Sequence, residues 1–309
     1  MSRIGTLYPT APYHFGLVLD VLARYIHPAT DVGYDGAYWR VLSIGDDLAL
    51  IRVDNLGTIT SPGLGVDLVQ STGAVNHETV LSQVGYIMGE DADMTGFYTC
   101  AKTDPTLWRI VEPLVGLRWL RTPTVFEALM TTVIEQQIAW TAAQKAQLWL
   151  VEWAGHRVHH DGRDFYAFPT PAQIADATVD ALKPLKITFK RMNVMIDIAQ
   201  QVVMGSLDLE RLRELSMEDA YKALTAIKGI GHWTATWTLQ RARGWHNYVG
   251  HNDVALQAAV NHYFYGDEGK ISAEQVAEIF AQYGDYAGSA ANYTIMRWVL
   301  DRYAANSDG

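Results

Sequence analysis

The stretch Leu224-Thr-Ala-Ile-Lys-Gly-Ile-Gly-His-Trp-Thr-Ala-Thr-Trp237 decides how this sequence is interpreted. Its apolar spacing predicts one helix from about 217 to 227 and another from about 232 to 243, joined by four residues that include two glycines. Glycine permits the positive φ of a tight turn and lets another backbone approach closely. The free N–H groups and positive dipole end of the second helix suit a phosphate. The glycines fit two structures equally well: a helical hairpin that binds a DNA backbone, or an ordinary helix connection with glycine as its C-cap.

The charge distribution points to the same part of the chain. The net charge is −10, which as a whole argues against a polyanionic partner, because DNA binding depends on Lys and Arg. However, residues 1–110 hold 6 basic and 12 acidic side chains, whereas residues 183–244 hold 10 and 6. If any part of the chain meets a polyanion, the second segment is the candidate, but charge alone favours a mildly basic surface that has no partner. The predicted backbone contacts are Lys228, Gly229, Ile230, Gly231, Thr234, Lys190 and Arg191.

Asp253 stands immediately before the helical stretch 254–260. An aspartate at such a position normally caps a helix, and for an isolated Asp that is the preferred interpretation. A helix N-terminus also favours the ionised form of a carboxylate. A role as helix cap is therefore compatible with a role in catalysis.

Composition limits the class of protein. The 309 residues are 49% hydrophobic and 19% charged, which is ample for a sizeable core. No apolar run reaches the length of a membrane span, and the first residues lack the order of a signal peptide. The single cysteine, Cys100, excludes an intramolecular disulfide and a four-cysteine metal or iron–sulfur site. We expect a reducing, cytoplasmic and nucleoid-associated location.

Two domains are predicted. In residues 1–110, strand-like alternation over 36–44 and 48–55 and helical stretches over 17–25 and 79–88 indicate an α+β domain. From about residue 105 the pattern becomes helical and stays so, giving a helical domain over 111–303 and a frayed tail over 304–309. Predicted helix starts include a helix after Thr122-Pro123, the capping boxes Thr141–Gln144 and Thr170–Gln173, and the cap at Ser216.

In this order the motifs resemble the helix-hairpin-helix (HhH-GPD) DNA glycosylase superfamily, and within it the 3-methyladenine DNA glycosylase II family of alkylation repair. The segments that carry the resemblance are 38–42, 89–97, 126–138, 168–171 and 185–191, together with the hairpin and Asp253. The resemblance implies a TATA-binding-protein-like α+β domain followed by an all-α glycosylase domain. It also implies a monomer that acts on double-stranded DNA with a damaged base, without a cofactor or membrane contact. Whether the hairpin holds a monovalent cation is left open.

The resemblance assigns roles to particular residues. Asp253 would stabilise the cationic sugar that forms as the glycosidic bond breaks, or activate the attacking water. Bifunctional relatives carry a nucleophilic lysine two residues after the second hairpin glycine; here that residue is Trp233, so no Schiff base is expected. Trp233 and Trp237 suit a wall that stacks on a cationic alkylated base, with core packing as the alternative. The predicted lesion pocket is Trp233, Trp237, Gln136 and Tyr286, and Gln137 is the predicted wedge that fills the gap in the duplex.

The sequence departs from the family pattern in two places. His251-Asn252 replaces the proline and second acid that often precede the catalytic aspartate, and an arginine is missing from the segment 283–290. Three functions therefore stay open: a monofunctional glycosylase for alkylated bases, a lesion-sensing or architectural DNA-binding protein without chemistry, and a glycosylase for oxidised bases that does not cleave the strand.

Overall fold

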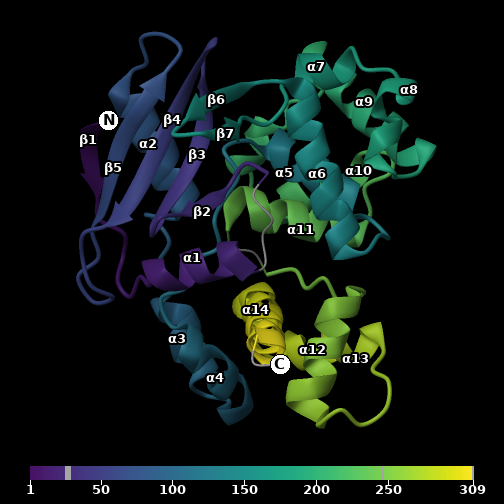
Figure 1. The fold of residues 1–309 in the computed structure, drawn as a ribbon. Helices are drawn as coiled ribbons and strands as arrows, with labels where there is room; N and C mark the ends of the chain where they lie inside the picture. Colours follow the sequence, from purple (N-terminus) through teal and green to yellow (C-terminus); the bar gives the residue numbers. More distant parts are fainter. Residues whose placement is uncertain (25–28, 245–246, 308–309) are drawn as a thin grey trace.

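The computed structural model describes residues 1–24, 29–244 and 247–307. Its N-terminal part contains a five-stranded antiparallel sheet in the order β1-β5-β4-β3-β2 (Figure 1). The strands are β1 (Ser2–Leu7), β2 (Val32–Tyr34), β3 (Ala37–Ile44), β4 (Asp47–Asn55) and β5 (Leu64–Ser71). The two predicted strands are confirmed as β3 and β4, and the two predicted helices as α1 (Phe15–Arg24) and α2 (His77–Met88).

The two faces of the sheet have different partners. On one face, Ile51, Val53 and Val66 pack with Val80 of α2 in a core that extends to the C-terminal helices. On the other face, Trp39 stacks on Phe165 of a small hairpin, with ring centroids 5.4 Å apart. That hairpin consists of β6 (Arg157–His160) and β7 (Arg163–Tyr166). The prediction of an all-α second domain is therefore wrong at this point, because the hairpin is needed to cover the apolar part of the sheet.

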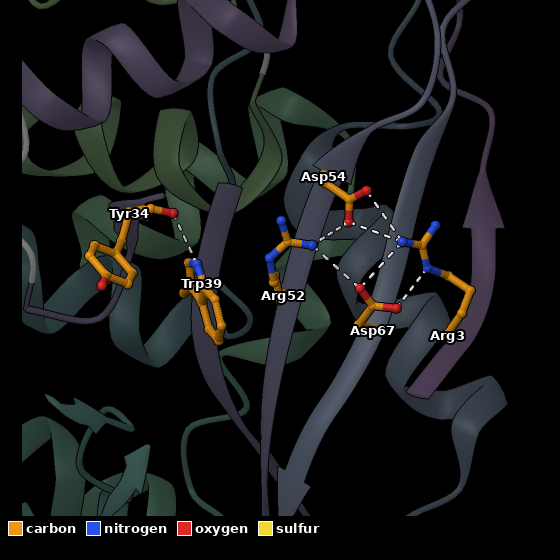
Figure 2. A network of polar contacts seen from close by, with 6 residues as sticks. All are labelled: Arg3, Tyr34, Trp39, Arg52, Asp54 and Asp67. Atoms are coloured by element: carbon orange, nitrogen blue, oxygen red, sulfur yellow. Dashed lines mark hydrogen bonds and ion pairs between the residues drawn. The ribbon is translucent and has the colours of Figure 1, made fainter. Parts of the chain in front are cut away.

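The rest of that face carries a row of charged side chains across adjacent strands. Cross-strand pairing places Trp39 opposite Arg52, Arg52 opposite Asp67, and Asp67 opposite Arg3. Figure 2 shows the resulting network, in which both arginines pair with Asp54 and Asp67. Opposite charges on neighbouring strands stabilise this part of the sheet.

The helices form two groups with separate cores. Helices α5 to α11 surround one core, whereas α3, α4 and α12 to α14 share the core beneath the sheet (Figure 1). Their bounds are α3 (Thr95–Ala101), α4 (Pro105–Val111), α5 (Val125–Glu135), α6 (Trp140–Ala154), α7 (Pro171–Ala175), α8 (Val179–Leu182), α9 (Phe189–Val203), α10 (Met217–Ala226), α11 (His232–Arg243), α12 (Val254–Tyr265), α13 (Ala273–Ala281) and α14 (Ala287–Ser307). Single 3₁₀ turns occur at η1 (Glu112–Leu114), η2 (Lys183–Leu185), η3 (Glu210–Arg213) and η4 (Gly284–Tyr286).

The helix caps show how local sequence sets these bounds. The capping box at Thr170 and the cap at Ser216 are confirmed. The box predicted at Thr141 is wrong, since α6 begins one residue earlier, at Trp140, with Ala139 as its cap. The tail predicted to fray from 304 continues α14 as far as Ser307. Within the described residues, no helix is both long and apolar enough to cross a membrane.

Candidate active site

The predicted hairpin is present between α10 and α11. Gly229 has φ +93°, and a Cβ on it would lie 2.7 Å from Val194 Cγ2 on α9. Gly231 has φ −98°, and a Cβ there would meet no atom within 4 Å. Ile230 is buried and anchors the turn, whereas Lys228 is exposed. The two glycines therefore serve different needs: Gly229 allows the turn and its packing on α9, and Gly231 leaves open space before the first turn of α11.

This difference gives a matched pair of variants. Gly229→Ala is expected to destabilise the fold by about 1–3 kcal/mol, because alanine is strained at that φ and its methyl would strike Val194. Gly231→Ala is expected to change stability by less than about 0.5 kcal/mol, since its backbone and surroundings accept a methyl group. Chemical denaturation of both variants checks this. Equal losses of stability would contradict the separate roles.

A cleft with a volume of about 1330 Å³ opens beside the hairpin. It lies between the two helix groups, where the ends of α5, α9 and α11 face α12 and α14. Most residues that the sequence predicted for the site line this cleft. They are Asp253, Trp233, Trp237, Gln136, Gln137, Thr234, Gly229, Lys190 and Arg191.

Asp253 is held by the first turns of two helices. One carboxylate oxygen, Oδ1, accepts hydrogen bonds from the backbone N–H groups of Ala255 (2.8 Å) and Leu256 (3.0 Å), so Asp253 caps α12. The other oxygen, Oδ2, accepts a hydrogen bond from Trp233 Nε1 at 2.7 Å. Asp253 makes no ion pair with any described residue. The site thus presents an oriented carboxylate without a cationic partner in the wall of the cleft.

A second carboxylate in the cleft is already paired. Arg241 donates to both oxygens of Glu135, at 2.9 and 2.7 Å, and its guanidinium lies 5.7 Å from the Trp237 ring. Burial raises the pKa of Glu135, and the Arg241 cation opposes that rise. The Arg241 cation balances the charge of Glu135. Asp253 is therefore the carboxylate whose charge is free to attract a positive charge that enters the cleft.

The end of α5 places Gln137 at the edge of the cleft. Gln137 is exposed and has φ +52°, a conformation that side-chain-bearing residues rarely adopt. Gln136 holds this end to the hairpin, since its Nε2 donates to Thr234 Oγ1 (2.8 Å) and the Gly229 carbonyl (3.3 Å). From α9, Arg191 donates to the carbonyls of Ile134 (3.2 Å) and Gln136. These contacts fix the backbone from which Gln137 projects.

Two of the predicted DNA-backbone contacts, Arg191 and Thr234, have side chains that are bonded within the protein. Arg191 is 8% exposed, and its guanidinium is turned to the backbone carbonyls at the end of α5. The Thr234 side chain is 3% exposed and accepts the Gln136 amide. Both side chains are engaged within the cleft wall, and their contact with DNA stays a prediction. Lys190 and Lys228 are exposed, and their contact with DNA stays a prediction.

The prediction of Tyr286 as a pocket residue is wrong. Tyr286 lies in η4, where its ring packs 6.2 Å from that of Phe97 on α3, and it does not line the cleft. Instead α14 supplies Trp298, with the Arg302 guanidinium 4.5 Å from its ring centroid. The cleft residues that sequence reasoning missed include Trp140 and, on one face of α14, Ile295, Trp298, Val299 and Arg302. Their i, i+3, i+4, i+7 spacing was visible in the sequence but did not show which core or cavity that face meets.

The chain is similar in sequence and in fold to DNA-3-methyladenine glycosylases. It is 31% identical over 220 residues to a DNA-3-methyladenine glycosylase of Bacillus subtilis (strain 168), covering 70% of this chain and 72% of that relative. It is 25% identical over 242 residues to DNA-3-methyladenine glycosylase 2 of Escherichia coli (strain K12), covering 78% and 80%. The solved 3-methyladenine DNA-glycosylase of Archaeoglobus fulgidus shares its fold, with a TM-score of 0.80, 24% identity, and 97% and 98% of the two chains covered. No protein-family model matches the chain.

Proposed function

The chain belongs to the DNA-3-methyladenine glycosylase family, and we propose that its cleft takes up a flipped-out alkylated base beside Asp253. As a member of this family it is a base-excision repair glycosylase, a hydrolase of the N-glycosidic bond. The finer assignments, which concern the residues, the lesion and the path of the DNA, are proposals. They rest on the geometry of the cleft.

The observation that carries the proposal is the position of Asp253. When the glycosidic bond breaks, positive charge develops on the sugar, and a fixed carboxylate nearby stabilises it without having to reorient. The same carboxylate can accept a proton from the attacking water. Three hydrogen bonds hold Asp253 in one orientation at the cleft wall, and no described cation neutralises it.

The aromatic wall favours a cationic, electron-poor base. Trp233, Trp237, Trp140 and Trp298 line the cleft, and indole faces attract cations. Trp233 also occupies the position at which the resemblance places the lysine of bifunctional relatives. We therefore propose hydrolysis without a covalent protein–DNA intermediate and without strand cleavage.

The DNA backbone is proposed to run along the hairpin and the start of α9. Lys228 and Lys190 are exposed there, and the first turn of α11 offers free N–H groups and its positive dipole end. Gln137, exposed at the edge of the cleft, is the proposed wedge that replaces the flipped base. Because contacts with phosphates release counterions, binding should weaken as the salt concentration increases.

For the architecture, we propose that residues 1–110 form a TATA-binding-protein-like α+β domain and residues 111–303 the glycosylase domain. The antiparallel sheet with α2 against one face supports this arrangement. Helices α5 to α11 of the proposed glycosylase domain have a core of their own, whereas α12 to α14 of that domain share the core of the sheet.

Release of free base from a panel of lesion duplexes tests the proposed function. The panel contains a methylated purine, hypoxanthine, an oxidised purine and undamaged DNA, with borohydride added in parallel to trap any Schiff base. We expect release of the methylated purine and no trapped adduct. Tight lesion binding without release would indicate a lesion-sensing protein, and release of the oxidised purine alone would change the substrate class.

The hydrogen bond from Trp233 to Asp253 predicts a specific loss. Trp233→Phe keeps an aromatic face but removes the Nε1–H that orients Oδ2, so we expect the single-turnover rate constant to fall about tenfold. Trp237→Phe is the matched control, because Trp237 Nε1 has no hydrogen-bond partner among the described residues. Its rate constant is expected to fall less than about threefold. Equal losses would show that the indole acts by stacking and not through Asp253.

A further inference from the structure

Four aromatic rings that do not line the cleft form a column of two stacked pairs near Asp253, and the pairs meet edge to face where Tyr221 contacts His232. The rings of Tyr221 on α10 and Tyr248 are stacked with centroids 4.0 Å apart. The imidazoles of His232 and His251 are stacked with centroids 4.4 Å apart. His232 is the first residue of α11, whereas Tyr248 and His251 belong to the loop that leads into Asp253. The column therefore joins the hairpin helices to the segment that carries the proposed catalytic carboxylate.

Hydrogen bonds define the protonation state that this column requires. His232 Nε2 lies 2.7 Å from the carbonyl oxygen of Val249, and since a carbonyl only accepts, Nε2 carries a hydrogen. His232 Nδ1 lies 2.8 Å from the Tyr221 hydroxyl. A neutral imidazole with its hydrogen on Nε2 accepts the Tyr221 hydroxyl hydrogen at Nδ1, so both ring nitrogens are matched. A second proton on Nδ1 would remove that acceptor.

The surroundings of His232 disfavour its protonated form. Burial lowers the pKa of His232, the Val249 carbonyl opposes this, and His251 lowers the pKa further. The positive end of the α11 dipole acts in the same direction as burial. The titratable and charged groups that face the column from neighbouring elements are Tyr221, Glu218 and Lys222 on α10, Tyr248 and His251 in the loop, and Glu274 on α13. Glu274 is exposed and interacts with His251.

Backbone hydrogen bonds within the loop connect the position of Val249 to that of Asp253. The N–H of His251 donates to the Val249 carbonyl, and the N–H of Asp253 donates to the Gly250 carbonyl, both at 2.8 Å. Gln257 of α12 holds the His251 carbonyl at 3.1 Å. The first turn of α11 thus contacts this segment twice, through His232 to Val249 and through Trp233 to Asp253.

We propose that His232, with His251 stacked on it, is a positioning residue that holds the Asp253 loop in its productive place only while the His232 imidazole is neutral. The inference rests on the proposed catalytic role of Asp253. It gives a function to His251, one of the residues at which this sequence departs from the family pattern.

The sign of the pH effect follows from the lowered pKa. Above about pH 6.5, the ordinary pKa of histidine, the imidazole is neutral in both the folded and the unfolded chain and the positioning contact is complete. Below that pH the unfolded or opened loop takes up a proton that the closed loop resists, so the closed arrangement weakens as the pH falls. We expect the rate constant of base release to decline below about pH 6.5 even where the DNA stays bound.

The experiment measures single-turnover base release at saturating enzyme, from a methylated-purine duplex, between pH 5 and 8. His232→Gln places an amide that does not titrate near the position of Nε2, where it can donate to Val249; we expect it to flatten the decline at low pH. His232→Leu loses the donor, and its rate constant should fall about tenfold at every pH, while the affinity for DNA changes less than about threefold. His262→Gln is the control, an exposed histidine paired with Asp267 elsewhere on α12, and it should keep the wild-type pH profile.

Two outcomes would overturn the inference. One is a decline in His232→Gln that matches the wild type, and the other is a wild-type rate constant that does not change with pH. If the variants fold poorly, ¹⁵N NMR of the wild-type imidazoles decides the matter, because a His232 that is doubly protonated at pH 7.5 contradicts the proposal. Asp253→Asn distinguishes the two proposals. Full activity in that variant refutes the catalytic role of Asp253, whereas the pH profiles of the His232 variants test only the role of His232.

Discussion

Replacing Asp253 with asparagine is expected to lower the rate constant of base release by about 10²–10³-fold, the scale observed when one preorganised electrostatic group is removed from a transition state. Asparagine has nearly the same shape but carries no charge, so it cannot offset the positive charge on the sugar. Single-turnover assays on a methylated-purine duplex check this. The affinity for the duplex should change much less, because the proposed backbone contacts lie in the hairpin and at Lys190.

A measurement of stability distinguishes this loss of catalysis from a loss of the folded site. In Asp253→Asn the side-chain carbonyl can still accept the N–H groups of Ala255 and Leu256, so the cap on α12 survives and unfolding should shift by less than about 1 kcal/mol. The amide nitrogen then faces Trp233 Nε1, which is also a donor. Adding Trp233→Phe to Asp253→Asn should therefore cost little further activity, whereas Trp233→Phe alone costs about tenfold. Additive losses in the double variant would mean that the two side chains act independently.

Local sequence was enough to predict the hairpin and the cap. The glycine pattern at 229–231 and the aspartate before α12 each act within a few residues, and the structure has both. Local sequence also determines the turns of two hairpins that were not predicted, β2–β3 and β6–β7. Asp35-Gly36 and Asp161-Gly162 have positive φ at both residues, as expected of Asp-Gly turns between strands. These dipeptides could have predicted β2 and the β6–β7 hairpin.

Other features depend on contacts that the sequence does not show. The direction of Tyr286 is decided by α3, which comes nearly two hundred residues earlier and offers Phe97 for packing. Arg191 sits in a basic segment and was expected to meet phosphate, but the carbonyls at the end of α5 take its guanidinium. In both cases residue type fixed what the side chain could bind, and tertiary packing decided which partner it found.

Replacing Arg40 with methionine is expected to lower the free energy of unfolding by about 3–5 kcal/mol, the range for removing one member of a buried ion pair. Arg40 on β3 is 1% exposed and pairs with Asp31 and with Glu127 on α5, so it ties the sheet to the helix that ends at the cleft. Methionine fills much of the volume but leaves Glu127 buried without its cation. Urea denaturation at pH 8 measures the loss. Arg52→Met in the network of Figure 2 is the control, because Asp54 and Asp67 still pair with Arg3 there. It should lower the free energy of unfolding by less than about 1 kcal/mol.

The pH dependence identifies Glu127 as the source of the loss. Burial raises the pKa of Glu127, and the Arg40 cation opposes that rise; without Arg40 the pKa should be higher still. The folded variant then holds a proton that the unfolded chain has released, so its stability increases as the pH falls from 8 toward 5. The gap between Arg40→Met and the wild type should therefore narrow at low pH. Adding Glu127→Gln to Arg40→Met should recover much of the lost stability at pH 8, because a neutral amide needs no cation. If the double variant is no more stable than Arg40→Met, the loss arises from packing around β3 and not from an unpaired carboxylate.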